Sequence, residues 1–297
     1  MHKLLRVGLF SGLLLIAACS QESAPQPTAV RPAAAFVGSE ACADCHAQEY
    51  ADWRESHHDL AMQVASDDTV LADFSSTRFD YFGASTEFFQ ADGNFRVRTD
   101  DANGDQQEYL VTHTFGVYPL QQYLVEFPGG RLQTLPYAWD TRPEEQGGQR
   151  WFHVYGDQEI APGDELHWTG RQQNWNYMCA ECHSTDLQVN YDQAADSFDT
   201  TWSEINVGCE ACHGPASNHV VDANNDQLRG RMGLLVDLDD HGRAVWQMNP
   251  VTGIADRSEL AMQSSRQPEA CGRCHSRIGV ITADYEYGVP LADTHRP

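Results

Sequence analysis

The feature that most constrains this chain is a five-residue unit, Cys-x-x-Cys-His, which occurs four times. We number these units in chain order as unit 1 (42–46), unit 2 (179–183), unit 3 (209–213) and unit 4 (271–275). With nine cysteines and thirteen histidines in 297 residues, chance would produce roughly 0.01 such units. Each unit offers two thiols one helical turn apart and then an imidazole. This pattern is typical of covalent haem c, in which the thiols bond the porphyrin and the imidazole binds the iron.

The four units therefore supply the residues expected to hold four haem c groups. The expected covalent attachment points are Cys42, Cys45, Cys179, Cys182, Cys209, Cys212, Cys271 and Cys274. The expected proximal iron ligands are His46, His183, His213 and His275. Tetrahedral zinc sites and structural disulfides are the alternatives for these cysteines, but neither explains a histidine after all four pairs.

The N-terminal residues predict export and lipid attachment. Residues 1–18 combine Lys3 and Arg6 with an apolar stretch that is too short to span a membrane, as in a signal peptide. The small residues directly before Cys19 resemble a bacterial lipobox, so we expect lipid on Cys19. Ser20 in the next position predicts a periplasmic protein anchored to the outer membrane. An ordinary signal peptide with an incidental cysteine remains the alternative.

The rest of the chain predicts one haem domain behind a linker. Residues 19–36 are rich in Pro, Ala, Gln and Ser, which is typical of a flexible tether. Residues 37–297 are expected to form one tetrahaem cytochrome c domain. Its expected class is α+β with little regular secondary structure, because four haems replace much of the protein core. An antiparallel β insert is expected at about 79–140, since Asp92-Gly93 and Pro128-Gly129-Gly130 separate strand-like runs.

Residues 39–64 show a helical pattern that affects the choice of distal ligands. Tyr50 and Trp53 follow His46 on one helix face. If the helix continued to His58, this residue would lie about 18 Å along the axis from His46. It would then reach the iron of a neighbouring haem and not that of unit 1.

Five sequence blocks resemble one family of bacterial multihaem cytochromes, the cytochrome c-554-like proteins that are often fused to tetratricopeptide repeats. These blocks are FVGSEACADCHAQEYADWRESHHDLAM (36–62), TFGVYPLQQYLVEFPGGRLQ (114–133), HWTGRQQNWNYMCAECHST (167–185), TTWSEINVGCEACHGPASNH (200–219) and CGRCHSR (271–277). Members of the family usually continue with further units and helical repeats. The resemblance therefore implies a C-terminally truncated chain.

The resemblance also implies two of the distal ligands. The patterns Trp-x-x-Ser-x-His and Cys-His-Gly-Pro-x-Ser-x-His place such ligands at His58 and His219. The other candidate distal ligands are His167, His153 and His113. The remaining histidines of the mature chain are His57, His241 and His295, and methionine ligation is open at Met62, Met178 and Met248.

Two functions stay open. The first is electron transfer by six-coordinate haems between redox partner proteins, such as other cytochromes or quinol-linked complexes. The second is a reductase or oxidase of small nitrogen or sulfur compounds, which needs one open haem. His57, Tyr177 and Arg171 are its candidates for proton supply and anion binding. The formal charge of −24 argues against nucleic acid. It suits a basic redox partner, or simply a solvated surface that keeps the protein soluble.

Overall fold

The computed structural model describes residues 31–227, 233–236, 238, 245–258, 266–282 and 285–296. The chain divides into two compact bodies, Met1–Ala33 and Ala34–Pro297, and the fold described below belongs to the second. The predicted signal peptide, the predicted lipidation site Cys19 and His241 lie outside the described residues. Among the residues that are described, no helix is long and apolar enough to cross a membrane.

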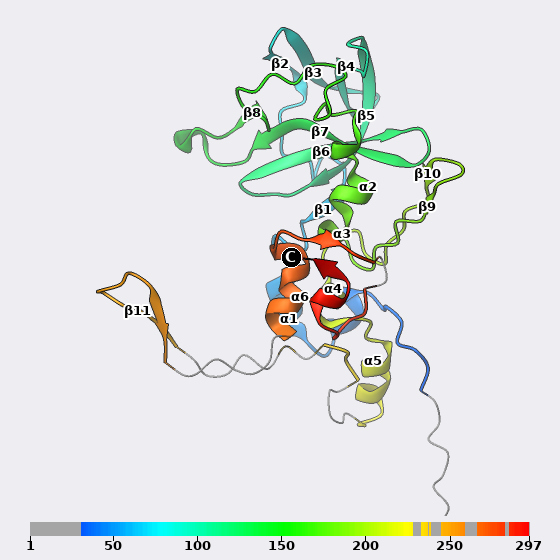
Figure 1. Ribbon diagram of the computed structural model, residues 1–297, viewed down its shortest axis with the longest axis vertical. Helices are drawn as coiled ribbons and strands as arrows, with labels where there is room; N and C mark the ends of the chain where they lie inside the picture. The colour runs from blue at the N-terminus through cyan, green and yellow to red at the C-terminus, as the bar shows by residue number, and fades with distance from the viewer. Residues whose placement is uncertain are drawn as a thin grey trace, which may run out of the picture. The chain divides into compact units, whose positions relative to one another are not determined.

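An eight-stranded antiparallel sheet dominates the regular structure (Figure 1). Its main path runs in sequence order from β2 to β8, and the short strand β1 pairs with β5. The strands are β1 (Met62–Val64), β2 (Ser75–Tyr81), β3 (Ala84–Ala91), β4 (Asn94–Asp100), β5 (Gln106–Phe115), β6 (Leu120–Phe127), β7 (Arg131–Asp140) and β8 (Arg150–His153). Because every main-path neighbour follows along the chain, short turns suffice to build the sheet.

The predicted β insert is confirmed, although it is longer than expected. Asp92 and Gly93, with φ of 52° and 74°, form the turn between β3 and β4. Gly129 and Gly130 also have positive φ and turn β6 into β7. The main path of the sheet runs from Ser75 to His153, beyond the predicted 79–140, and β1 adds residues 62–64. Strand β8 has no clear sequence signal, because its four residues are too few for alternation to show.

Two hydrophobic clusters fill the sheet and the segment that leads to unit 2. The first cluster is mainly aromatic and includes Phe88, which stacks on Trp151 at 3.6 Å between ring centroids. The second cluster contains Met62, Phe115, Leu124, Leu132, Trp175 and Ala180. Ala180 belongs to unit 2, so this second cluster ties the unit to strands β5, β6 and β7.

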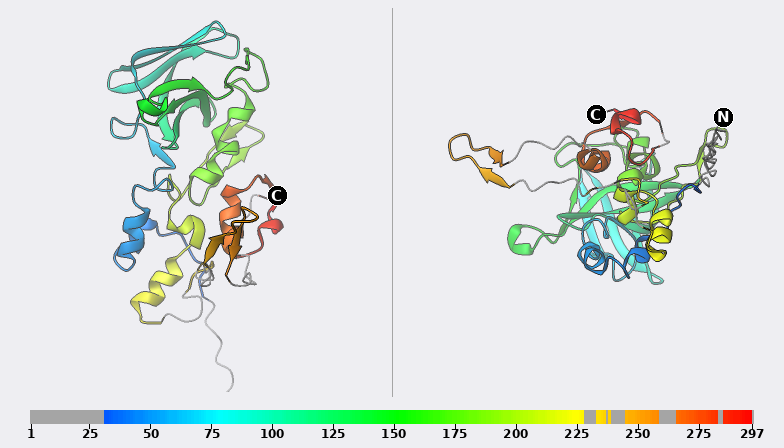
Figure 2. Two further views of the ribbon diagram at one scale, coloured as in Figure 1. Left: turned by 90° about the vertical axis from the view of Figure 1, so that its left-hand side faces the viewer. Right: turned by 90° about the horizontal axis from the view of Figure 1, so that it is seen from below.

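The helices are few and short, as expected for a haem-wrapping chain. Figures 1 and 2 show α2 and α3 leading from the sheet to the cysteine-bearing helices. The α-helices are α1 (Ala47–Trp53), α2 (Trp175–Met178), α3 (Ala180–His183), α4 (Cys209–His213), α5 (Ser217–Asn224) and α6 (Arg266–His275). The 3₁₀ helices are η1 (Ser39–Cys42), η2 (Glu144–Gln146), η3 (Arg171–Gln173) and η4 (Leu291–Asp293).

The helical pattern predicted for 39–64 is wrong beyond Trp53. Helix α1 ends there, because Arg54 is extended (ψ 136°) and Glu55 has φ of 61°. The carboxylate of Asp59 accepts a hydrogen bond from the Glu55 amide and stabilises the turn. His58 therefore lies in a turn and not on a continuing helix. The predicted separation of about 18 Å between His46 and His58 assumed a continuous helix and does not apply.

Three two-stranded hairpins complete the described structure. They pair β9 (Tyr191–Asp192) with β10 (Ser197–Phe198), β11 (Trp246–Met248) with β12 (Ala255–Arg257), and β13 (Gly279–Val280) with β14 (His295–Arg296). The first hairpin is bound to the β6–β7 turn, where the Phe198 amide donates to the Gly129 carbonyl.

Candidate haem sites

Unit 1 and unit 3 lie together although more than 160 residues separate them. The Ser39 hydroxyl, at the start of η1, donates to the carboxylate of Glu204 and accepts a hydrogen bond from the Cys209 amide at 2.9 Å. The thiol of Cys42 lies beside that of Cys209, and this neighbour lowers the pKa of Cys209. The first cysteine of unit 1 therefore lies against the first cysteine of unit 3.

A buried carboxylate between the two cysteines of unit 3 reinforces this pairing. Glu210 is 1% exposed. It accepts hydrogen bonds at 2.8–2.9 Å from the amides of Val37, Gly38 and Ala216. Because backbone N–H groups bond strongly to an ionised acceptor, Glu210 anchors the segment that enters unit 1.

Unit 2 and unit 4 form a second pair. Glu181 of unit 2 accepts hydrogen bonds at 3.0 Å from the Arg273 guanidinium of unit 4 and lies 3.0 Å from His295 Nε2. The Arg273 side chain is 11% exposed, and its charge lies over the Tyr285 ring at 4.3 Å. The thiol of Cys274 lies beside that of Cys182 and lowers its pKa.

Unit 3 and unit 4 are in contact through Tyr287. Its hydroxyl accepts from Arg273 at 3.2 Å, and its ring packs against Gly214, directly after unit 3. Gly214 has φ of 76°, and a Cβ there would lie 3.0 Å from the ring. Burial raises the pKa of the Cys212 thiol, and electrostatic repulsion from Cys271 adds to this effect. The contacts therefore link the units in the order 1, 3, 4, 2.

Two predicted distal histidines each face a predicted proximal histidine. The rings of His46 and His219 have centroids 6.0 Å apart. Those of His58 and His275 have centroids 6.1 Å apart. A metal bound to two imidazole nitrogens, each about 2 Å away, would hold the ring centroids about 6 Å apart. Both pairs thus fit an iron between them, and in each pair the distal candidate follows a different unit from the one it faces.

A backbone carbonyl orients His183, the predicted proximal histidine of unit 2. His183 lies 2.9 Å from the Ala61 carbonyl through Nδ1 and makes an edge contact with the Phe115 ring. With its proton on Nδ1, the ring presents Nε2 as a lone-pair donor. Burial lowers the pKa of His183, so the neutral, metal-binding form predominates at neutral pH.

The other three candidate distal ligands lie on or beside the sheet. His167 bonds Asp100 at 3.0 Å through Nε2 and Thr169 at 2.8 Å through Nδ1. His153 stacks on Tyr81 at 3.6 Å. His113 lies on β5 beside the second hydrophobic cluster. The centroid of its ring is 6.4 Å from that of Trp202, which packs against this cluster. Neither His153 nor His167 has a described contact with a Cys-x-x-Cys-His unit.

Four charged residues that organise the units did not stand out from the sequence: Glu181, Glu204, Glu210 and Arg273. Three of them occupy the variable positions inside a unit. The sequence signal for these residues is a charged side chain at a variable position of a Cys-x-x-Cys-His unit. The partner of that side chain lies too far along the chain to be recognised before the fold is known.

The cysteine geometry bears on the alternatives to haem. The eight cysteines of the four units are free of disulfides. Across the described ranges, no three or more His, Cys, Asp or Glu side chains cluster in a way that could hold a metal ion alone.

The comparisons with known proteins agree with this chemistry. The family model described as cytochrome c554 and c-prime matches residues 41–79 and 154–214, which contain units 1, 2 and 3. The stretch between the two matched segments corresponds closely to the sheet. No curated relative matches the chain.

Two solved structures are similar. One is the outer cell wall cytochrome OcwA, with 19% identity and a TM-score of 0.52, covering 88% of this chain and 44% of that one. The other is an undecaheme cytochrome from the S-layer of Carboxydothermus ferrireducens, with 18% identity and a TM-score of 0.40, covering 69% and 24%. The chain thus spans less than half the length of either protein.

The matched segments and the four Cys-x-x-Cys-His units together support a multihaem c-type cytochrome.

Proposed function

We propose that the four units each hold one haem c and that the protein is an exported electron carrier, anchored to the outer membrane by lipid on Cys19. Haem c supplies an iron that gains or loses one electron at a time. The observation that carries the proposal is the pair of facing histidine rings, His46 with His219 and His58 with His275, at separations that suit two ligands on one iron.

The pairing of units supports a continuous electron path in the order 1, 3, 4, 2. The Cys42–Cys209 contact joins the first two sites, and the Cys182–Cys274 contact joins the last two. Tyr287 bridges units 3 and 4. His113 is the candidate distal ligand for unit 2, because it lies beside the hydrophobic cluster that contains Ala180.

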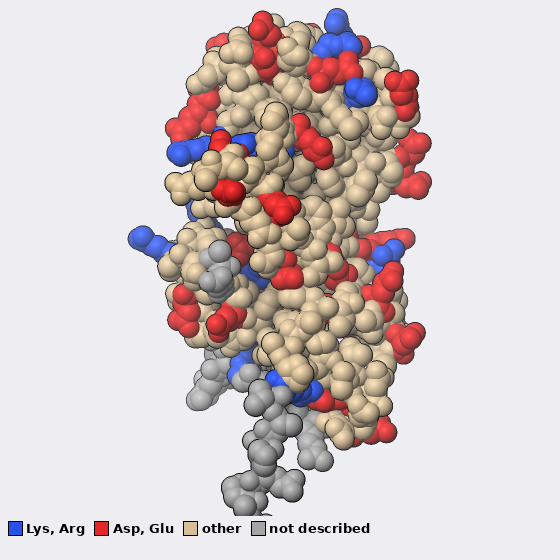
Figure 3. All heavy atoms as spheres, turned by 90° about the vertical axis from the view of Figure 1, so that its right-hand side faces the viewer, with Lys and Arg blue, Asp and Glu red and all other residues tan. Residues whose placement is uncertain are grey.

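The charge of the chain favours a basic redox partner in the periplasm. The only lysine, Lys3, lies in the predicted signal peptide. Figure 3 shows acidic side chains over much of one face, with few arginines among them. Complementary charge raises the rate of encounter with a basic partner, and salt screens this attraction.

Distal-ligand variants of the holoprotein test the axial pairs. We expect His219→Ala and His58→Ala each to convert one haem from low spin to high spin in the visible spectrum of the oxidised protein. His57→Ala is the matched control, because His57 precedes His58 in the same turn and contacts Tyr118 instead. A spectrum of His219→Ala or His58→Ala that matched that of His57→Ala would refute the corresponding pair.

A pyridine haemochrome assay tests the cofactor count. Four haems for each chain are expected, and a smaller number would refute the proposal. A high-spin component in the unmutated protein that binds nitrite or CO would favour the reductase alternative over a pure carrier.

A further inference from the structure

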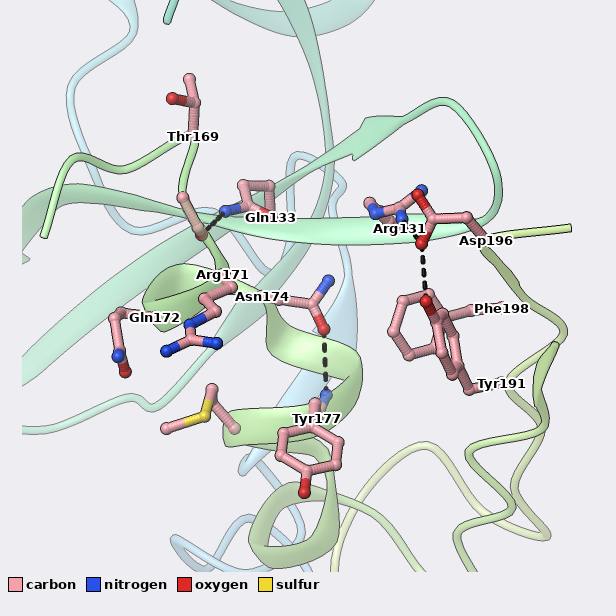
Figure 4. A pocket seen from close by; sticks show the side chains of 12 residues that line it. Arg131, Gln133, Thr169, Arg171, Gln172, Asn174, Tyr177, Tyr191, Asp196 and Phe198 are labelled. Carbon is pink, nitrogen blue, oxygen red and sulfur yellow. Dashed lines mark hydrogen bonds and ion pairs between the residues drawn. The ribbon is translucent and has the colours of Figure 1, made fainter. Parts of the chain in front are cut away.

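A cavity of about 460 Å³ lies between η3, α2 and the β9–β10 hairpin (Figure 4). One side is formed by the rings of Tyr191 and Phe198, with centroids 4.7 Å apart. Arg171 and Gln172 approach from η3, and Tyr177 lies on α2. The volume falls within the range of about 300–1,000 Å³ that is usual for small-molecule sites.

The aromatic side of the cavity is fixed in place by an ion pair. Asp196 accepts a hydrogen bond from the Arg131 guanidinium and another from the Tyr191 hydroxyl, both at 2.6 Å. The Arg131 charge also lies 5.7 Å from the centre of the Phe198 ring. Because Asp196 and Arg131 neutralise each other, the hairpin adds flat apolar surface to the cavity and little net charge.

The opposite side adds a positive charge. The Arg171 side chain is 85% exposed, and Glu165, which pairs with it at 3.8 Å, is also largely exposed. Tyr177 is 74% exposed. The Asn174 side chain accepts from the Tyr177 amide and so fixes the start of α2. The lining of the cavity thus combines a cation on one side with aromatic rings on the other, in a chain that is otherwise strongly acidic (Figure 4).

The cavity is next to unit 2 but separate from it. Successive side chains on a strand point to opposite faces. On β7, Arg131 and Gln133 line the cavity, whereas Leu132 belongs to the cluster against which Cys179 packs. Strand β7 therefore stands between the cavity and the first thiol of unit 2, while Met178, which lines the cavity, directly precedes Cys179.

We propose that this cavity binds a planar aromatic anion that exchanges electrons with the haem of unit 2. Flat apolar walls favour an aromatic ligand, and Arg171 favours a negative substituent. A sulfonated or carboxylated quinone has this chemistry. Its reduction consumes two electrons, delivered singly by the haems, and two protons from solvent, and it yields the hydroquinone. This redox role rests on the proposed haem function, whereas binding does not.

Binding to the oxidised holoprotein is measured by equilibrium dialysis with anthraquinone-2,6-disulfonate and with redox-inert naphthalene-2,6-disulfonate. We expect saturable binding of both, roughly tenfold weaker in Arg171→Gln because a charge-assisted contact is lost. Arg150→Gln is the matched control, since Arg150 is exposed on β8 and does not line the cavity. Tyr191→Ala should weaken binding, whereas Tyr191→Phe, which keeps the ring, should bind nearly as well as the unmutated protein.

Binding that is not saturable, or equal affinities for Arg171→Gln and Arg150→Gln, would overturn the site. The redox role is tested separately by mixing reduced holoprotein with the quinone. Hydroquinone should form more slowly in Arg171→Gln at subsaturating quinone. Equal rates in the two arginine variants would overturn the redox role, and the haemochrome count of the same samples tests the haem assignment independently.

Discussion

The bond between Glu181 and Arg273 provides a strict test of how units 2 and 4 are held together. In Glu181→Gln, the Arg273 guanidinium, with an exposed side-chain fraction of 11%, keeps the Tyr287 hydroxyl but loses its carboxylate at 3.0 Å. His295, which is 1% exposed, loses the same carboxylate. Removing one partner of a buried ion pair costs about 3–5 kcal/mol. Since Glu181 itself is 25% exposed, we expect a loss near 3 kcal/mol.

Urea unfolding of the holoprotein, followed by circular dichroism and by the haem Soret band, measures this loss. Glu165→Gln is the matched control, because the Arg171–Glu165 pair is exposed and spans 3.8 Å, so a change below about 0.5 kcal/mol is expected. In Glu181→Gln/Arg273→Met, the loss should be smaller than the sum of the single losses, because no unpaired cation remains. A Glu181→Gln loss no greater than that of Glu165→Gln would refute the reasoning.

Three further predictions concern the unit 1–unit 3 contact, the sheet and the redox partner. Glu210→Gln should lower the free energy of unfolding by about 2–4 kcal/mol, since charge-assisted bonds to three backbone amides are weakened. Glu145→Gln is the control, because Glu145 is exposed. Equal effects of the two substitutions would contradict the anchoring role of Glu210. Burial lowers the pKa of His153 to about 4, so the unfolded state binds more protons between pH 6.5 and 4, and stability should fall as the pH falls through this window. His153→Phe should reduce the difference between the free energies of unfolding at pH 7 and pH 4.5, as measured by urea unfolding. An unchanged difference would contradict this prediction. Electron transfer to mitochondrial cytochrome c, a basic protein, should slow several-fold between 10 and 200 mM salt in stopped-flow mixing; a salt-independent rate would argue against an acidic docking face.

The features of the fold that depend on local sequence were predictable. Turn chemistry at Asp92-Gly93 and Pro128-Gly129-Gly130 located two hairpins, because positive φ selects glycine and aspartate at these positions. Strand β8 and the end of helix α1 were not predictable in this way. Strand β8 is stabilised by pairing with β7, and α1 ends at a turn that a carboxylate four residues away stabilises.

In the candidate site, too, some features follow from local sequence and others depend on the fold. The cysteines and proximal histidines follow from spacing alone. His46 and His219 lie close together because Glu210 and Glu204 bind segments that are more than 160 residues away along the chain. His153 and His167 are ligand candidates by residue type, and in the fold they contact Tyr81 and Asp100. Composition alone does not predict these contacts.

The most direct test of the central claim is electron paramagnetic resonance of the oxidised holoprotein and of His219→Ala. We predict low-spin signals from the haems proposed at units 1 and 4 in the unmutated protein, because a second histidine ring lies 6.0 and 6.1 Å from the predicted proximal rings of these units. His219→Ala should lose one low-spin signal and gain one high-spin signal, with the other haems unchanged. An unchanged spectrum in His219→Ala, with four haems still attached, would contradict the claim that His46 and His219 share one iron.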